Sequence, residues 1–228
     1  MPGVDEFSVE KHHVYVTLFY DIRNSRIIHI EEGKESEVFL RFLQKNPFID
    51  PKGIEHVSMD MDPSFISGAE KYIPDSQIVF DHFHVIKMMN DALDRIRRKE
   101  AKENVILKGT RYTLFMNPDK LSEKQKEKLK DIRKLDLQVT HAYHFKESLQ
   151  RLWSLRNEMV VDYLAKWISW ARRSRMPEII RLAKSMWRHM EGILEAIRSG
   201  ISSGIVEGLK KQDPYRIQAV LWLQCPRI

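Results

Sequence analysis

The chain has 228 residues, of which 43% are hydrophobic and 31% charged, and a formal net charge of +6; such a chain can bury one sizeable core, or one core and a helical subdomain. Its single cysteine, Cys225, excludes internal disulfides and cysteine-built zinc sites and indicates a reducing compartment. No apolar run reaches the roughly 18 residues of a membrane-spanning helix, and Asp5 and Glu6 come too early for a signal peptide.

The first 50 residues predict three strands and a helix. The strands are expected at residues 4–9, 14–20 and 26–30. The second of them is apolar on both faces, which is typical of an interior strand. The helix is expected over residues 35–45, because Val38, Phe39 and Phe42 recur at helical spacing.

Residues 54–98 carry the pattern strand, helix, strand, helix. The first strand ends on Asp60, and Pro63 suits the first position of the helix that follows. A second strand is expected at residues 77–80, before a long helix that begins near His84. A β-α-β unit makes its two strands parallel and places functional residues at their carboxyl ends, and Asp60 occupies such an end.

Three strands, a helix, a fourth strand, a helix and a fifth strand follow the order of the ribonuclease-H-like fold. In that topology the first and fourth strands are neighbours. Asp5 in the first strand would therefore approach Asp60 at the end of the fourth. We predict an α/β protein with a ribonuclease-H-like core and an all-α insertion.

The character of the chain changes after Arg98. Few β-branched clusters follow, and helices are expected at residues 121–135, 137–155, 158–173 and 177–198. Ser122, with Gln125 three residues later, predicts a capping box for the first of them. Clusters of Lys and Arg from residue 95 onward favour a polyanionic partner, although a mixed-charge helical face would contain as many. The predicted parts are 1–98, the first part of the core; 99–198, an all-helical insertion; and 199–228, a last helix and its tail.

Short motifs follow one another along the chain in the order seen in one known family. They are Gly3-Val4-Asp5-Glu6, Val57-Ser58-Met59-Asp60-Met61, Asp81-x-Phe83-His84-Val85, Leu107-Lys108-Gly109-Thr110-Arg111-Tyr112 and Gly204-Ile205-Val206-Glu207-Gly208. Together they resemble the DDE transposases of bacterial insertion sequences, specifically the ISL-three type, over residues 3–208. The third motif is specific because it follows a strand-ending Asp, whereas a lone Asp or Glu would carry little weight.

The resemblance implies a catalytic triad of Asp5, Asp60 and Glu207, with the last on the helix after residue 199. These carboxylates would also be the metal ligands for two Mg²⁺ ions, with Mn²⁺ as the alternative. Mg²⁺ prefers hard oxygen ligands, and two ions about 3.5–4 Å apart serve in-line displacement at phosphorus. The implied partners are DNA, as transposon ends and target, and further copies of the chain. No membrane is implied, and the expected location is the bacterial cytoplasm.

Each triad assignment has a plainer alternative. Asp5 could be an exposed strand acid, with Glu6 beside it as a rival ligand. Asp60 could be an ordinary turn residue, with Asp62 as its rival. Glu207 could be a first-turn acid favoured by the helix dipole.

Asp81 and His84 look like a metal pair at the start of a helix. An Asp in that position more often caps the helix through backbone N–H groups, and a His more often packs with its hydrogen bonds satisfied. We therefore assign Asp81 and His84 supporting or structural roles and do not count them as ligands.

The chain departs from the family pattern at both ends. The family's end-reading portion is missing before Asp5, and after Gly208 the pattern is lost, with Pro214 interrupting the expected helix. We expect a truncated transposase catalytic domain for Mg²⁺-dependent DNA strand cleavage and transfer, inactive by itself. The alternative is an inactive DNA-binding or dimerising remnant that interferes with full-length transposase. A ribonuclease-H-like nuclease of another kind is a third hypothesis.

Overall fold

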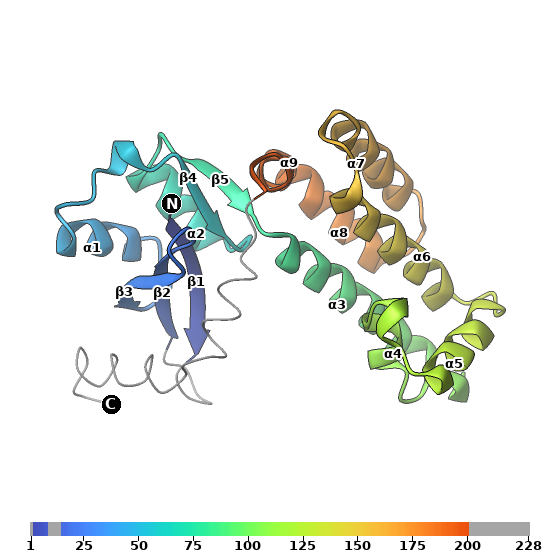
Figure 1. Ribbon diagram of the computed structural model, residues 1–228. Helices are drawn as coiled ribbons and strands as arrows, with labels where there is room; N and C mark the ends of the chain where they lie inside the picture. The colour runs from blue at the N-terminus through green and yellow to red at the C-terminus, as the bar shows by residue number, and fades with distance from the viewer. Residues whose placement is uncertain (1, 9–14, 201–228) are drawn as a thin grey trace. The chain divides into compact units, whose positions relative to one another are not determined.

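The computed structural model describes residues 2–8 and 15–200 and is a mixed α/β structure (Figure 1). The predictions for Glu207 and for the last helix fall outside these residues. The chain divides into two compact units. One holds the sheet, with residues up to His84 and the helix after Met190; the other is Val85–Met190. Within the described ranges, no helix is both long and apolar enough to cross a membrane.

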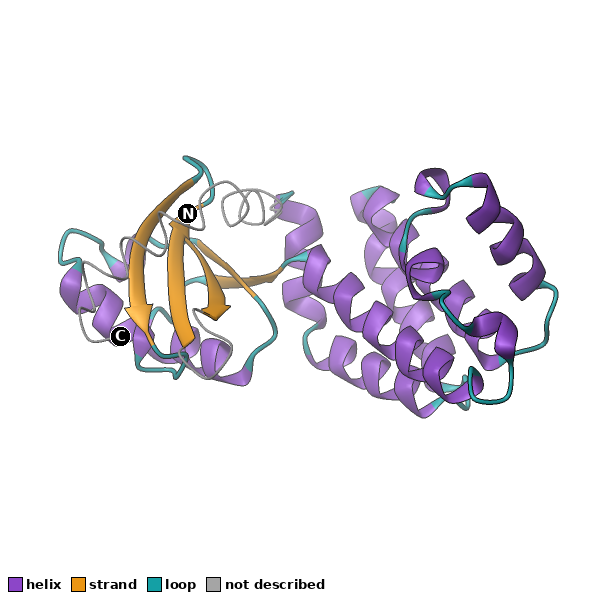
Figure 2. Cartoon of the chain, turned by 90° about the horizontal axis from the view of Figure 1, so that it is seen from below, coloured by secondary structure: helices purple, strands orange, loops and turns teal. Residues whose placement is uncertain are grey.

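A five-stranded sheet forms the centre of the first unit (Figure 2). Its strands are β1 (Pro2–Ser8), β2 (Tyr15–Asp21), β3 (Arg26–Glu32), β4 (His56–Met59) and β5 (Gln77–Phe80). Their spatial order is β3-β2-β1-β4-β5. The first three strands pair antiparallel, and β4 runs parallel to both β1 and β5. The predicted neighbourhood of the first and fourth strands is confirmed.

Two helices, α1 (Val38–Lys45) and α2 (Pro63–Tyr72), cover one face of this sheet through an aromatic cluster. The ring of Phe19 on β2 stacks on Phe42 with centroids 4.1 Å apart and meets Phe39 edge-on at 5.5 Å. Phe65 of α2 contacts Phe39 in turn. Each such buried ring contributes roughly 1.5–3 kcal/mol, so this cluster anchors both helices to the sheet.

The remaining helices follow β5. They are α3 (His82–Glu100), α4 (Arg111–Phe115), α5 (Glu123–Arg133), α6 (Gln138–Arg151), α7 (Asn157–Arg172), α8 (Pro177–Arg188) and α9 (Met190–Ser199). The predicted capping box of Ser122 and Gln125 is present at the start of α5. Buried apolar side chains, including Leu93, Leu149 and Leu164, form the core of the helical unit.

The prediction of a single helix over residues 177–198 is wrong. The chain forms two helices there, separated at His189, whose backbone angles (φ −108°, ψ 20°) leave the helical region. The division between the two compact units falls beside this residue, at Met190 and Glu191. In the first unit Gly192 of α9 lies so close to Phe80 that an added Cβ would sit 2.4 Å from its ring. Packing against the sheet, which local helix propensity does not encode, thus decides where the helix breaks.

A distant carboxylate caps the start of α6. The Glu100 side chain accepts hydrogen bonds from the backbone N–H groups of Gln138, at 2.9 Å, and Val139, at 2.8 Å. The residue before the helix, Leu137, has no side-chain acceptor of its own. Glu100 therefore satisfies two of the four N–H groups that every helix start leaves open.

Glu100→Ala is expected to lower the free energy of unfolding by about 1–2 kcal/mol, because two backbone N–H groups at the start of α6 lose their acceptor. Urea denaturation followed by far-ultraviolet circular dichroism measures the change. Glu103→Ala, at an exposed position of the same segment, is the matched control and should be close to neutral. Equal losses from both substitutions would contradict the capping role.

Candidate active site

The register of β1 and β4 brings two predicted acids to neighbouring positions on one face of the sheet. Gly3 of β1 is level with Ser58 of β4 in the parallel pair. Counting two residues along each strand places Asp5 and Asp60 in the next row, and residues two apart lie on the same face. Asp60 is the first residue after β4. Asp5, in the middle of β1, and Asp60, just after β4, therefore lie on neighbouring strands and on one face of the sheet.

A third carboxylate extends the row onto β5. Met59 is level with Phe80 in the parallel pair of β4 and β5, so Asp60 and Asp81 each follow the last paired residue of their strand. Asp81 is buried, with 1% of its surface exposed. The ring Nδ1 of His82 lies 3.6 Å from one Asp81 oxygen. Asp81 thus lines the same end of the sheet as Asp5 and Asp60.

Tyr20 gives a second indication that Asp5 and Asp81 share one face. Tyr20 on β2 is level with Gly3, and an added Cβ on Gly3 would lie 2.1 Å from the tyrosine ring. Burial raises the pKa of Tyr20 well above its ordinary value, and the charges of Asp5 and then Asp81 raise it further. The hydroxyl consequently stays protonated beside the carboxylates, and Gly3 is required because the ring occupies the space over it.

Gly3→Ala is expected to lower the free energy of unfolding by about 1–3 kcal/mol, because the new methyl group must displace a buried ring. Gly53→Ala is the matched control, since the nearest atom to its added Cβ is 4.0 Å away. Thermal or urea unfolding of both variants measures the difference. A Gly3→Ala protein as stable as the wild type would show that Tyr20 moves aside at no cost.

The loop after β4 is organised by two successive carboxylates. Asp60 Oδ1 accepts a hydrogen bond from the backbone N–H of Asp62 at 2.8 Å. Asp62 in turn accepts from the N–H of Ser64 at 2.8 Å and caps α2, with Pro63 at the first helical position. Asp62, the rival for Asp60, therefore has a structural task of its own, while the N–H contact orients the Asp60 carboxylate.

The other predicted residues fall in different places. Glu6 follows Asp5 on β1 and so points to the other face of the sheet; it lies 3.7 Å from Lys34. His84 is half-buried in the first turn of α3, and its backbone N–H donates to the carbonyl of Asp81 at 3.1 Å. Glu207 lies outside the described residues.

Ser58 is a polar residue at this site that the sequence reasoning missed. Its side chain is buried in β4, on the face that carries Asp5 and Asp60, and its Oγ has no hydrogen-bond partner among the described residues. A lone serine between the apolar residues Val57 and Met59 was the available signal.

The donors at this edge fit a hard divalent cation, because carboxylate and hydroxyl oxygens are the ligands that Mg²⁺ prefers. Among the residues that the structure describes, no three His, Cys, Asp or Glu side chains come close enough together to hold a metal ion. The third proposed acid, Glu207, is not among those residues. Asp5 and Asp60 by themselves could supply only part of such a ligand set.

A cavity of about 430 Å³ opens at the other end of the sheet. Its lining includes Pro2 and His56, the first residues of β1 and β4, together with Arg23 and Asp50. Neither Asp5 nor Asp60 lines this cavity, so it is separate from the carboxylate row.

Comparison with known proteins gives a consistent result. The model of a family described as transposase, the DDE group of the ISL-three type, matches residues 3–212. The transposase for insertion sequence element IS1557 of Mycobacterium tuberculosis is 32% identical over 233 residues, covering 90% of this chain and 52% of that protein. The transposase for insertion sequence element IS1001 of Bordetella parapertussis is 26% identical over 216 residues, covering 91% and 53%. The chain spans about half the length of these curated relatives. No solved structure matches it.

Proposed function

This chain belongs to the DDE transposases of insertion sequences, of the ISL-three type, and from that premise we propose that it carries the catalytic part of such an enzyme. In this proposal Asp5, Asp60 and Glu207 hold two Mg²⁺ ions, or Mn²⁺, for cleavage and transfer of DNA strands. The observation that supports it is the parallel pairing of β1 and β4 with Gly3 level with Ser58, because Asp5 and Asp60 each follow two residues later on neighbouring strands.

The sheet supports a ribonuclease-H-like core. Its order β3-β2-β1-β4-β5, with β4 and β5 parallel to β1 and the first three strands antiparallel, is the arrangement expected of that fold. The proposed parts are residues 1–98 and 199–228 for the core and 99–198 for a helical insertion. The separate all-helical unit, Val85–Met190, supports an insertion between Asp60 and Glu207.

The proposed chemistry is in-line displacement at a phosphodiester. Bound divalent ions would activate the attacking water or 3′-hydroxyl and stabilise the leaving oxygen. In this proposal the pairing of β1 with β4 keeps Asp5 near Asp60. The backbone N–H of Asp62 orients the Asp60 carboxylate. The Tyr20 hydroxyl remains protonated and adds no negative charge to the site. The proposed partners are DNA, as element ends and target, and further copies of the chain.

A strand-transfer assay tests the proposal with a pre-cut end of the element that encodes this chain and a supercoiled target plasmid. A chain that is active by itself, contrary to the expectation from its sequence, gives joined products with Mg²⁺ or Mn²⁺ and none in the presence of a chelator. Absence of joined products under both metals would contradict catalysis by this chain.

Metal titration separates this function from the alternative of an inactive DNA-binding or dimerising remnant. A metal site stabilises the folded state by about 2.7 kcal/mol at a hundredfold excess over its dissociation constant. We expect Mg²⁺ to raise the melting temperature of the wild type and not that of an Asp5→Asn, Asp60→Asn double variant. A remnant would bind DNA and show no Mg²⁺-linked stabilisation.

A further inference from the structure

Three arginines surround one buried carboxylate in the helical unit. Asp94 of α3 is 5% exposed. Its Oδ1 lies 2.7 Å from Arg97 Nη2, and its Oδ2 lies 2.7 Å from Arg98 Nε and 3.9 Å from Arg111 Nε. One negative charge therefore faces three positive charges, and the cluster keeps an excess of two.

The three arginines differ in how much they expose. Arg97 is 12% exposed and also donates to the carbonyl of Leu107, so it is part of the interior. Arg98 is 66% and Arg111 47% exposed, although one edge of each guanidinium faces Asp94. Arg111 also lies over the ring of Phe115, 5.2 Å from its centroid. The exposed guanidinium groups of Arg98 and Arg111 are thus each held on one side by Asp94, and that of Arg111 also by the ring of Phe115.

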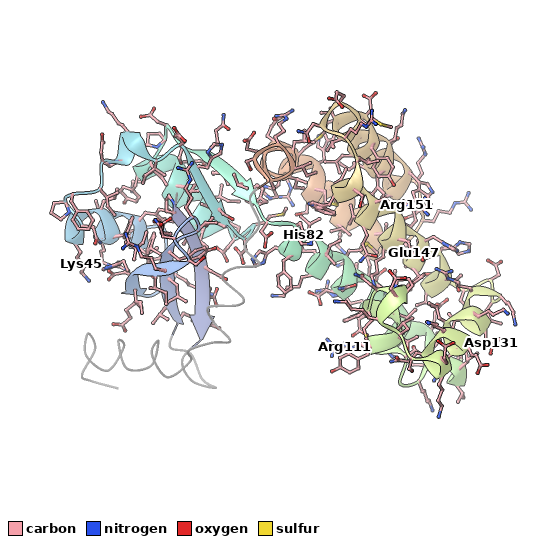
Figure 3. All side chains as sticks on the ribbon, viewed as in Figure 1. Lys45, His82, Arg111, Asp131, Glu147 and Arg151 are labelled. Carbon is pink, nitrogen blue, oxygen red and sulfur yellow. The ribbon has the colours of Figure 1, made fainter. Side chains whose placement is uncertain are left out.

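The motif Leu107-Lys108-Gly109-Thr110-Arg111-Tyr112 builds the turn that carries Arg111 to this position. Gly109 has φ +71°, a left-handed conformation that favours glycine. The hydroxyl of the buried Thr110 donates to the carbonyl of Leu107 at 2.7 Å and closes the turn. Arg111 then begins α4, where Figure 3 labels it. None of these residues has a task in the carboxylate row, so the motif needs a separate explanation.

We propose that Arg98 and Arg111, anchored on Asp94, form a binding site for the phosphate backbone of DNA on the helical unit. The inference rests on the proposed function only in taking DNA as the partner. The planar guanidinium matches phosphate oxygens with two parallel hydrogen bonds. Because Asp94 and Phe115 already hold the arginines, less side-chain entropy is lost when a phosphate binds. The excess of two positive charges supplies the attraction.

Fluorescence anisotropy with a labelled duplex of about 20 base pairs, in a chelator and over a series of salt concentrations, tests the site. Arg98→Gln with Arg111→Gln is expected to weaken binding about tenfold and to lower the slope of log K against log salt by about 1 to 2. Arg172→Gln with Arg173→Gln removes the same charge from the exposed end of α7 and should change both quantities much less. Equal losses from the two pairs, or no loss from the first, would overturn the local site.

Two further variants distinguish an anchored site from diffuse charge. Arg98→Lys with Arg111→Lys keeps the charge and loses the planar fork, so the salt slope should persist while affinity falls severalfold. Asp94→Asn removes one negative charge and so raises the net charge by one. If DNA is attracted only by the overall positive charge, this variant should bind more tightly. If Asp94 holds Arg98 and Arg111 in position, its loss should weaken binding. A melting curve checks that each variant is folded. Tighter binding by folded Asp94→Asn protein would overturn the inference.

The assay contains no divalent metal, so its result is independent of strand transfer. A wild-type chain that binds DNA through Arg98 and Arg111 and never joins strands would contradict the proposed catalysis and leave this site standing. A wild-type chain that does not bind the duplex at all would contradict both.

Discussion

Under the proposed function, Asp60→Asn is expected to reduce strand transfer about 10³-fold while leaving the fold intact, because a carboxylate that held a catalytic metal would contribute several kcal/mol to the transition state. Asparagine keeps an oxygen that can accept the N–H of Asp62, now 2.8 Å from Asp60 Oδ1. The loop that leads into α2 should therefore survive, and the loss can be assigned to the missing charge. The measurement is the rate of product joining at saturating Mg²⁺, beside a melting curve.

Asp62→Asn is the matched control for Asp60→Asn. Its side chain can still cap α2 through the N–H of Ser64, and it removes one negative charge two residues away. Strand transfer by this variant should remain within a fewfold of the wild type. If Asp62→Asn is the inactive protein and Asp60→Asn the active one, the two residues have been assigned the wrong way round.

Lys146→Met is expected to lower the free energy of unfolding by about 2–3 kcal/mol near neutral pH, because it leaves buried carbonyls without a donor. The ammonium group of Lys146 on α6 is buried, and it donates to the carbonyls of Leu114 and Phe115 at 2.6 Å and to that of Met116 at 3.5 Å. These carbonyls belong to the end of α4, which a helix cannot satisfy by itself. Lys146 thus joins α6 to α4.

The same residue gives stability a defined dependence on pH. Burial lowers the pKa of Lys146 from 10.5 to about 8. Between these two values the unfolded chain holds the proton and the folded chain does not, so the free energy of unfolding rises with pH. Below the folded pKa the full penalty of the buried charge is present, and it is relieved as pH increases. From about pH 7 to about pH 9.5 we expect the wild type to gain roughly 1–2 kcal/mol over Lys146→Met.

Urea unfolding of both proteins at the two pH values measures this difference. The tyrosines also titrate in this range, but their contribution to the free energy of unfolding is the same in both proteins and cancels from the difference. Lys134→Met is the control, since Lys134 is 64% exposed and pairs with Asp131 on the surface. Exposed pairs contribute about 0–1 kcal/mol, so this variant should be nearly neutral at both pH values. A wild-type advantage over Lys146→Met that shrinks with rising pH would show that the buried amine stays charged.

The strand positions, with Asp5 inside the first strand and Asp60 just after the fourth, could be predicted because they depend on local signals. Residues 14–20 are apolar on both faces, which indicated an interior strand, and β2 indeed pairs with β1 on one side and β3 on the other. Pro63 and the capping box of Ser122 and Gln125 located helix starts to within two residues. Hydrophobic periodicity and capping act over a few residues, so the sequence contains them directly.

The contacts between distant segments could not be predicted from these patterns. Nothing near Gly3 indicates that Tyr20 covers it, nor does the sequence around residue 138 show that Glu100 caps α6. The break at His189 also escaped prediction, because residues 177–198 have an unbroken helical period. Each of these features depends on which surfaces meet after folding, and many sequences with the same local pattern would pack differently.

By itself the sequence determined the alternation of strands and helices, the acids within the first strand and after the fourth, and the motifs shared with the transposase family. Only the tertiary structure decided the register of the β1–β4 pair, in which Gly3 is level with Ser58, and hence the row that Asp5 and Asp60 share. It also decided that Asp94 collects arginines from two helices. The physical reason is that side-chain periodicity is set by the backbone over a few residues, whereas register and long-range ion pairs are set by the one packing that buries the whole apolar surface at once.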